Sequence, residues 1–254
     1  MIKVSAYILT KNEEKHIREC IESVKWADEI VVVDDFSADS TVEIAKNMGC
    51  KVVRNKFEYF GKQRNFALTQ CSNDWVVCLD SDERITSELK AEIEQELKDT
   101  PRAAAFVAPR KSKFINRWIL HSGWYPDYRH PVLFNKNKMK YKDQLVHEDI
   151  DYSGKKVYFK GDILHYPYES IKQFVKKSDF YTNLRSREMF ERGKKFKVLN
   201  LFVNPGVMFF KMYVIRKGFL DGLTGFALAI SYSSFYILMK YVKLWELENK
   251  CSNS

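Results

Sequence analysis

In the first hundred residues, short apolar runs alternate with helical patterns, and this alternation limits the possible folds more than any other feature. Strands are predicted at residues 4–9, 29–35, 50–54 and 75–80, and helices at 14–27, 37–49, 62–71 and 87–99. Strands joined through helices pair as parallel sheets. The first half of the chain is therefore expected to be an open α/β sheet, whose ligands bind beyond the carboxyl ends of the strands.

Three of the predicted strands end in polar or acidic loops, at Thr10–Glu14, Asp34–Asp39 and Asp80–Glu83. A parallel sheet brings such ends to one edge, which favours a shared nucleotide pocket. Asp80 and Asp82 form a D-x-D pair, and Mg²⁺ or Mn²⁺ needs few protein oxygens when substrate phosphates complete its coordination. Asp and Ser also cap helices, but for Asp35 a ligand role is favoured.

The loop after the first strand reads TKNEE and contains no glycine. A dinucleotide-binding fold needs G-x-G-x-x-G at this point, and a sugar nucleotidyltransferase would typically have a glycine-rich phosphate loop there. Both classes are therefore disfavoured.

Charge is distributed unevenly along the chain. Residues 1–100 contain 14 Lys/Arg against 20 Asp/Glu, whereas residues 101–254 contain 28 against 13. The basic second half suits an anionic membrane or acceptor, and no familiar nucleic-acid signature accompanies it. Five widely spaced cysteines without a CxxC pair indicate a reducing compartment, and the N-terminal apolar run is interpreted as a strand rather than a signal peptide.

The segments ILTKNEE, EIVVVDDFSADST and GKQRNFALTQCSNDWVVCLDSDE together resemble the family 2 glycosyltransferases. LFNKNKMKYKDQLVHEDI (133–150) and ILHYPYESIKQFVKKSDFYT (163–182) resemble the subgroup of bacterial lipopolysaccharide-core glucosyltransferases. The resemblance implies a GT-A fold, which is a Rossmann-like mixed but mostly parallel sheet flanked by helices. It also implies a UDP-sugar donor, a Mg²⁺ or Mn²⁺ ion and inversion at the anomeric carbon.

Residue roles follow from the same resemblance. It implies that Thr10 and Glu13 border the base and ribose, that Asp35 bonds the base and that Arg64 reaches the uracil or the diphosphate. The other candidates for donor binding are Asn12, Gln63, Asn65, Asp80 and Ser81. The candidates for metal binding are Asp82, Asp80 and His165, with Asp82 favoured as the direct ligand. For His165, an ordinary hydrogen-bonded histidine is an equally good interpretation.

An inverting transfer needs a carboxylate that takes the proton of the acceptor hydroxyl. With the resemblance, Glu148 in VHED is the candidate and Asp149 the runner-up; from the residues alone, a solvated charged loop is as good an interpretation. In the irregular segment 121–131, Trp124 and Tyr125 offer faces for a sugar ring, while Asp127 and Arg129 can hydrogen-bond its hydroxyls or a donor phosphate. A packed aromatic turn is the alternative for this segment.

Three regions are expected: residues 1–105 as the nucleotide-sugar-binding half, 106–170 as the acceptor-binding half and 171–254 as a helical extension. In the extension, residues 170–195 predict a basic helix, and residues 222–239 carry no charge over 18 positions. This apolar stretch is borderline for a span and fits an interfacial or re-entrant membrane-binding helix pair better. A core helix or a dimer interface is the alternative.

Together these features predict a cytoplasmic enzyme, peripheral on the inner membrane face. It would transfer a sugar, with glucose from UDP-glucose as the favoured donor, to a lipopolysaccharide core or another lipid-linked saccharide. The alternatives are a sugar nucleotidyltransferase and a catalytically inactive nucleotide-sugar-binding module at the membrane. A homo-oligomer is compatible with the sequence.

Overall fold

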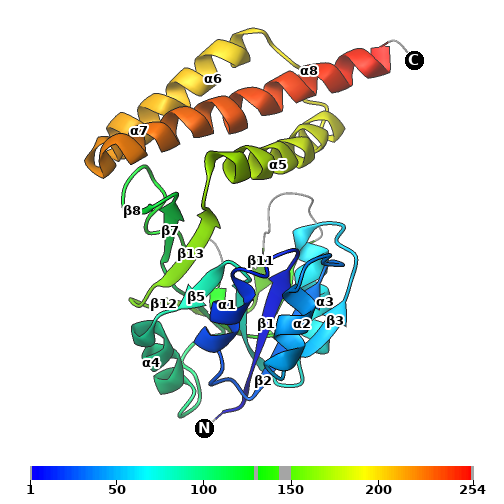
Figure 1. Cartoon of the computed structure of the whole chain (residues 1–254), viewed down its shortest axis with the longest axis vertical. Coiled ribbons are helices and arrows are strands. Elements are labelled where there is room, and N and C mark those ends of the chain that lie inside the picture. The colour runs from blue at the N-terminus through cyan, green and yellow to red at the C-terminus, as the bar shows by residue number, and fades with distance from the viewer. Residues whose placement is uncertain (1, 129–130, 143–149, 253–254) are drawn as a thin grey trace. The chain divides into compact units, whose positions relative to one another are not determined.

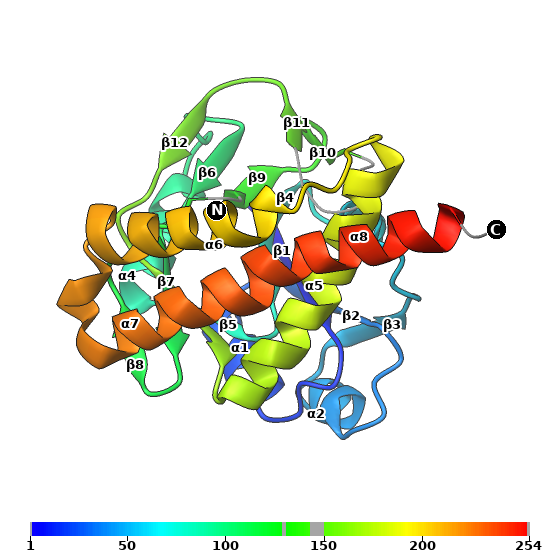
Figure 2. The same cartoon turned by 90° about the horizontal axis from the view of Figure 1, so that it is seen from above.

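The computed structural model describes residues 2–128, 131–142 and 150–252. The chain forms two compact units and passes between them three times (Figures 1 and 2). Unit 1 comprises Met1–Arg110 and Asp127–His165, and unit 2 comprises Lys111–Pro126 and Tyr166–Ser254. The donor-binding and acceptor-binding halves expected from the sequence are defined by what they bind, and the two units are defined by their internal contacts. The division into two halves therefore stays a prediction.

A seven-stranded sheet forms the centre of unit 1, in the order β12-β6-β9-β4-β1-β2-β3. Four of its six pairings are parallel, and only those of β9 are antiparallel. The expected mixed, mostly parallel sheet is therefore confirmed. Its strands are β1 (Val4–Thr10), β2 (Glu29–Asp34), β3 (Lys51–Arg54), β4 (Trp75–Asp80), β6 (Ala105–Val107), β9 (Pro131–Asn135) and β12 (Lys156–Tyr158).

Helices of unit 1 cover both faces of this sheet. Alternate residues of β1 point to opposite faces, so Ile8 joins one hydrophobic core while Tyr7 joins the other. The Ile8 core contains apolar residues of α1, α2 and α4, and the Tyr7 core contains Ala67 and Leu68 of α3. The helices are α1 (Ile17–Ser23), α2 (Thr41–Asn47), α3 (Phe60–Gln70) and α4 (Ser87–Glu96).

Four short strands complete unit 1. β5 (Glu83–Ile85) pairs antiparallel with the first half of β13 (Ile163–Tyr168), which sets His165 opposite Glu83. β10 (Met139–Tyr141) pairs antiparallel with β11 (Ile150–Tyr152). These pairings bring residues from the second half of the chain close to the D-x-D pair.

Unit 2 is mostly helical. It contains β8 (Arg117–Ile119), paired with β7 (Arg110–Phe114), and the 21-residue helix α5 (Ile171–Glu191), whose N-cap Ser170 accepts a hydrogen bond from the Gln173 amide. α6 (Leu199–Phe210) and the π-helical turn η1 (Lys211–Ile215) follow. The chain then continues through η2 (Gly218–Asp221), α7 (Gly222–Ser231), η3 (Tyr232–Leu238) and α8 (Met239–Ser252).

The last four of these elements form one continuous helix, Gly218–Lys250, which we call the C-terminal rod. Among the described residues it is the one helix whose length and composition would suffice to cross a bilayer, a criterion that core helices of soluble proteins also meet. Phe114, Phe174, Met212 and Leu228 form the hydrophobic core of unit 2, so the rod contributes to that core along part of its length.

Candidate active site

The carboxyl ends of three strands meet at one edge of the central sheet. β1 lies between β2 and β4, with Thr10 in register with Asp34 and Leu9 in register with Asp80. The backbone continues this pairing, since the Asp35 amide donates to the Thr10 carbonyl and the Ser81 amide donates to the Leu9 carbonyl, both at 3.0 Å. The strand order reverses between β1 and β4, which is where open α/β sheets bind ligands. The prediction that the three loops share one edge is confirmed.

Side chains at the tips of the first two loops bind the loops to each other. Asn12 has a left-handed backbone (φ 53°), which asparagine tolerates better than most residues, and its Oδ1 accepts a hydrogen bond from the Ala38 amide. Ser37 Oγ accepts from the Asn12 amide, and Asp39 accepts from the Glu14 amide. Asn12, a predicted donor-binding residue, therefore makes structural contacts that join the two loops.

Thr10 is the last residue of β1, and Asp35 directly follows β2. Asp35 Oδ1 accepts from the Phe57 amide at 3.0 Å, and Oδ2 pairs with Lys11 Nζ at 2.5 Å. Lys11 is exposed, so its ammonium can move aside when a ligand enters. Thr10 Oγ1 is buried and has no hydrogen-bond partner among the residues that the structure describes. A buried hydroxyl without a partner is costly, and a polar ligand at this edge would satisfy it.

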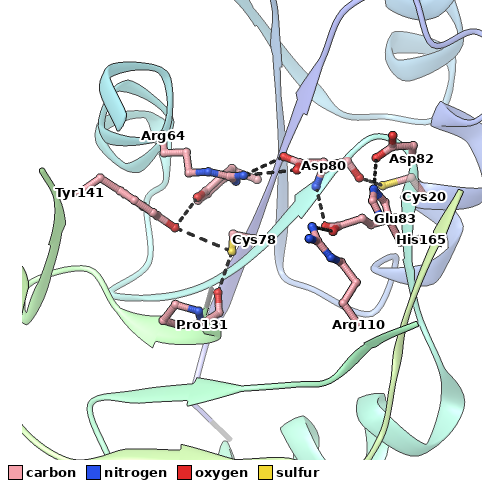
Figure 3. Close-up of polar contacts among 11 residues, drawn as sticks. Cys20, Arg64, Cys78, Asp80, Asp82, Glu83, Arg110, Pro131, Tyr141 and His165 are labelled. Atoms are coloured by element: carbon pink, nitrogen blue, oxygen red, sulfur yellow. Dashed lines mark hydrogen bonds and ion pairs between the residues drawn. The ribbon is translucent and has the colours of Figure 1, made fainter. Parts of the chain in front are cut away.

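Arg64 and Asp80 form the centre of the site (Figure 3). Arg64 Nη2 donates to both oxygens of Asp80, at 3.0 and 3.3 Å. The Arg64 guanidinium also lies over the ring of Tyr141, 5.8 Å from its centroid. The arginine side chain is almost fully buried, whereas that of Asp80 is 28% exposed. The pair therefore presents a carboxylate and a fixed cation at the strand end.

Asp82 faces His165, and Asp82 Oδ1 lies 3.6 Å from His165 Nε2 (Figure 3). β5 carries the chain on from Asp82 and pairs with β13, which explains why these distant residues meet. Within the described residues, no three His, Cys, Asp or Glu side chains form a ready-made metal cage. A carboxylate and an imidazole nevertheless fit a Mg²⁺ or Mn²⁺ ion whose other ligands are phosphate oxygens and water.

Glu83 links the D-x-D turn to Arg110 through hydrogen bonds. Its Oε2 accepts from the Asp80 amide at 3.0 Å, and its Oε1 accepts from Arg110 Nη1 at 3.1 Å. Arg110 Nη2 in turn donates to Asp127 Oδ2 at 2.6 Å. Burial, followed by repulsion from Asp80, raises the pKa of Glu83 to about 7. Burial alone would lower the pKa of Arg110, but Glu83 and Asp127 raise it above its ordinary value.

Three other predicted donor residues are engaged in the framework. Gln63 exchanges hydrogen bonds with Asn55, through Asn55 Nδ2 to Gln63 Oε1 and Gln63 Nε2 to the Asn55 carbonyl. Asn65 pairs with the backbone of Tyr141 in both directions and so fastens β10 to α3. Ser81 is buried. These contacts position Arg64, which lies between Gln63 and Asn65 on α3.

The predicted acceptor residues are divided between the two units. Trp124 belongs to unit 2, where its ring packs edge-on to Phe114 and also contacts Tyr168. Tyr125 belongs to unit 2 as well, whereas Asp127 belongs to unit 1 and is paired with Arg110. Arg129 and both predicted base residues, Glu148 and Asp149, lie outside the described residues.

Sequence reasoning included Glu83 in the acidic loop Asp80–Glu83 but gave it no role, and it missed Arg110 and Tyr141 as parts of the site. Glu83 directly follows the D-x-D pair, which was a usable signal, but Arg110 is 27 residues further along the chain. Tyr141 becomes relevant only through the pairing of β10 with α3. Cys78 of β4 is a small buried core residue, and burial raises the pKa of its thiol to about 12.

Comparison with known proteins places this geometry in a family. The model of "Glycosyl transferase family 2" matches residues 5–161. An uncharacterised glycosyltransferase of Rickettsia typhi is 33% identical over 264 residues, covering 100% of this chain and 90% of that protein. The lipopolysaccharide core biosynthesis glycosyltransferase LpsC of Rhizobium meliloti is 26% identical, covering 96% and 93%.

Among solved structures, Staphylococcus aureus TarS (residues 1–349) aligns at 16% identity and a TM-score of 0.49, covering 98% of this chain and 92% of that chain. Glucosyl-3-phosphoglycerate synthase from Mycobacterium tuberculosis, solved with Mn²⁺ and uridine diphosphate, aligns at 22% identity and a TM-score of 0.36 over 44% of each chain. The match to the family model and the full-length Rickettsia relative are decisive. The chain belongs to glycosyl transferase family 2, has the GT-A fold and is a glycosyltransferase.

Proposed function

We propose that this enzyme moves glucose from UDP-glucose to a saccharide carried on a lipid, such as a lipopolysaccharide core, with inversion at the anomeric carbon. The observation that carries the proposal is the meeting of Thr10, Asp35 and the Arg64–Asp80 pair at one edge of the sheet. This edge combines groups suited to a base, a ribose and a diphosphate.

The donor would lie across this edge. Asp35 can accept a hydrogen bond from the uracil N–H once Lys11 moves aside, and the buried Thr10 hydroxyl gains a partner. Arg64, fixed by Asp80 and Tyr141, supplies positive charge toward the diphosphate.

Asp82 and His165 are the residues that would hold the divalent cation, with Asp80 beside them bonded to Arg64. When bound, the cation supplies positive charge that stabilises the diphosphate as it leaves. Arg64 adds a second, fixed positive charge on the same side of the reaction. Both effects act on the leaving group, so the acceptor needs separate activation.

We propose that the carboxylate of Glu148 activates the acceptor. Asp149 is the alternative. The acceptor oxygen forms a bond to the anomeric carbon while the bond from that carbon to the diphosphate oxygen breaks. The proton of the acceptor hydroxyl passes to the carboxylate, and uridine diphosphate leaves with the electron pair of the broken bond. Because attack comes opposite the leaving group, an α-linked donor gives a β-linked product.

The acceptor is proposed from charge and from one relative. Residues 101–254 carry 28 Lys/Arg against 13 Asp/Glu, which suits a phosphorylated or membrane-bound acceptor. LpsC, similar over 96% of this chain, is named for lipopolysaccharide core biosynthesis. Since such acceptors are assembled on lipid, we propose that the enzyme works at the cytoplasmic face of the inner membrane as a peripheral protein.

The experiment is a transfer assay with the full chain, Mn²⁺ and detergent-dispersed lipopolysaccharide of truncated core, using UDP-glucose, UDP-N-acetylglucosamine and GDP-mannose in parallel. Proton NMR of the product reports the configuration of the new linkage. A β-glucosyl product formed only from UDP-glucose is the expected result.

Each other outcome of this assay indicates a different function for the protein. An α-linked product contradicts inversion, and consumption of UTP with glucose 1-phosphate and release of pyrophosphate indicates a nucleotidyltransferase. Tight nucleotide-sugar binding with neither transfer nor donor hydrolysis indicates a binding module without catalysis.

A further inference from the structure

Unit 2 carries a large exposed apolar surface. The structure describes all twelve residues of α6 and none of them is buried, whereas Leu228 and Ala229 of the neighbouring helix α7 are buried. Phe202 is 72% exposed and Leu223, on the rod, is 81% exposed. We define the apolar face as the exposed residues Val198, Leu199, Phe202, Val203, Val207, Phe210, Val214, Ile215, Phe219, Leu220 and Leu223.

The spacing of these residues shows that they form a surface rather than scattered exceptions. Leu199, Val203, Val207, Phe210 and Val214 recur every three or four positions and Phe202 is next to Val203, so they line one side of the helix formed by α6 and η1. A phenylalanine covers about 150–250 Å² when it becomes buried. Continuous apolar surface of this size on a folded protein usually marks an interaction site.

Charge around the apolar face is of one sign. Residues 192–245 contain nine Lys/Arg and one acidic residue, Asp221. Asp221 is buried and accepts hydrogen bonds from the amides of Leu120 and His121, and it pairs with the His121 ring at 3.0 Å, so it offers no negative charge to a partner. The exposed cations that flank α6 and η1 are Lys194, Lys195, Lys197, Lys211, Arg216 and Lys217.

A groove on this face combines the two features at short range. It is lined by Gly206, Val207, Phe210, Lys211, Ile215 and Arg216. A mainly apolar lining that also includes a lysine and an arginine suits an acyl chain with an anionic headgroup. An acidic protein would pair with the cations but would not bury so many exposed phenylalanines and aliphatic residues.

The packing within unit 2 argues against a membrane-spanning rod. α5 and α6 both pack on the rod and lie on opposite sides of it in Figure 1, and Figure 2 shows α6 running beside α7 and α8. On the α5 side, Lys243 of the rod donates to Asp179 and Thr182 of α5. Burying the rod in hydrocarbon would take this polar contact and the charged helix α5 with it, which is very costly.

We infer that the apolar face of unit 2, formed mainly by α6 and η1 rather than by residues 222–239, seats the enzyme in the surface of an anionic lipid bilayer without crossing it. A second copy of the chain is a poorer occupant, because self-association through this face would bring like charges together. The inference deepens the proposed function, and its biological purpose rests on the lipid-linked acceptor proposed there.

The test is flotation of the full chain with vesicles of phosphatidylethanolamine and phosphatidylglycerol, and with vesicles of phosphatidylcholine alone. We expect binding to the anionic vesicles at least about tenfold stronger than to the neutral ones, weakened by salt. The double variant Phe202→Glu/Leu223→Glu should lose about tenfold or more of this binding. Phe180→Glu, which changes an exposed phenylalanine on α5 outside the apolar face, is the matched control and should bind as the wild type.

Two further measurements keep the outcomes distinct. Circular dichroism and thermal stabilisation by UDP-glucose with Mn²⁺ check that the double variant is folded and that unit 1 is unchanged. Equal vesicle binding by wild type and double variant, or no binding by the wild type, overturns the inference. So does a wild-type dimer that becomes monomeric in the double variant by light scattering. Vesicle binding by a wild-type chain that nucleotide sugars do not stabilise upholds the inference while contradicting the proposed function.

Discussion

One nitrogen of Arg64 bonds both carboxylate oxygens of Asp80, at 3.0 and 3.3 Å. The first aspartate of the D-x-D pair is therefore paired with the guanidinium of Arg64 on α3. The second, Asp82, instead faces His165. We propose different roles for the two aspartates: Asp80 would orient Arg64 toward the diphosphate, and Asp82 is the candidate for direct metal contact.

Asp82→Ala should abolish metal-dependent binding of the donor while the fold persists, since Asp82 has the side chain proposed to contact the ion. The measurement is the shift in melting temperature on adding UDP with Mn²⁺. Asp74→Ala, which removes an exposed aspartate at the opposite end of β4, is the control and should retain the full shift. Metal-dependent stabilisation that survives in Asp82→Ala would remove Asp82 from the site.

Glu148→Gln should abolish sugar transfer and leave donor affinity unchanged, because an amide cannot take the acceptor proton. Initial rates of product formation and isothermal titration with UDP measure the two quantities separately. Asp149→Asn is the matched control and should retain most of the activity. If Glu148→Gln turned over normally and Asp149→Asn did not, the base would be Asp149.

Glu83 and Arg110 should be energetically coupled, because Glu83 joins the Asp80 amide to the Arg110 guanidinium. Glu83→Gln is expected to lower the free energy of unfolding by about 1–3 kcal/mol, since it leaves a buried donor poorly paired. In a double-mutant cycle with Arg110→Met, urea denaturation should give a coupling energy of about 1–3 kcal/mol. Glu43→Gln, at an exposed position on α2, should change stability little. Additive effects of Glu83→Gln and Arg110→Met would show that the pair does not act as a unit.

Glu29 should make stability depend on pH. Burial alone would raise the pKa of Glu29, but hydrogen bonds from Ser5 and Ser72 outweigh it and lower the pKa below its ordinary value. A carboxyl with a lowered pKa in the folded state stabilises the protein above its unfolded-state pKa, and this contribution is lost as the pH falls through the folded-state pKa.

Replacing this carboxylate in Glu29→Gln is thus expected to cost about 1 kcal/mol near neutral pH, a modest value for a partly exposed group, and less near about pH 4. Urea midpoints at the two pH values measure the difference. The control is Glu22→Gln, which alters an exposed ion pair with Lys25 and should have little effect at either pH. A cost for Glu29→Gln that grows on acidification would contradict the assignment.

The strands of the central sheet could be predicted because buried parallel strands are continuous apolar runs, and β1, β2 and β4 begin and end within a residue of the prediction. Helix starts were less accurate for a physical reason. The second helix begins at Thr41 rather than at residue 37, because Ser37 and Asp39 bond the Asn12 and Glu14 amides of the neighbouring loop instead of extending the helix.

The site was predictable only where its residues follow strand ends. Thr10, Asp35 and Asp80 do so, and the register of β1 with β2 and β4 then brings them together. Arg110 and Tyr141 enter the site through pairings between distant segments, which leave no local pattern in the sequence. The same holds for residues 111–126, which pack with the C-terminal helices rather than with their sequence neighbours.

The central claim is a metal-dependent site for a UDP-sugar at the carboxyl edge of the sheet, and thermal stabilisation tests it most directly. The full chain would be melted with UDP-, GDP- and dTDP-sugars, each with Mn²⁺ and with chelator, because a ligand that binds only the folded state raises the melting temperature. The account predicts stabilisation by UDP-glucose with Mn²⁺ that chelator removes. Stabilisation that is equal with chelator, or the absence of a response to every nucleotide sugar, would contradict it.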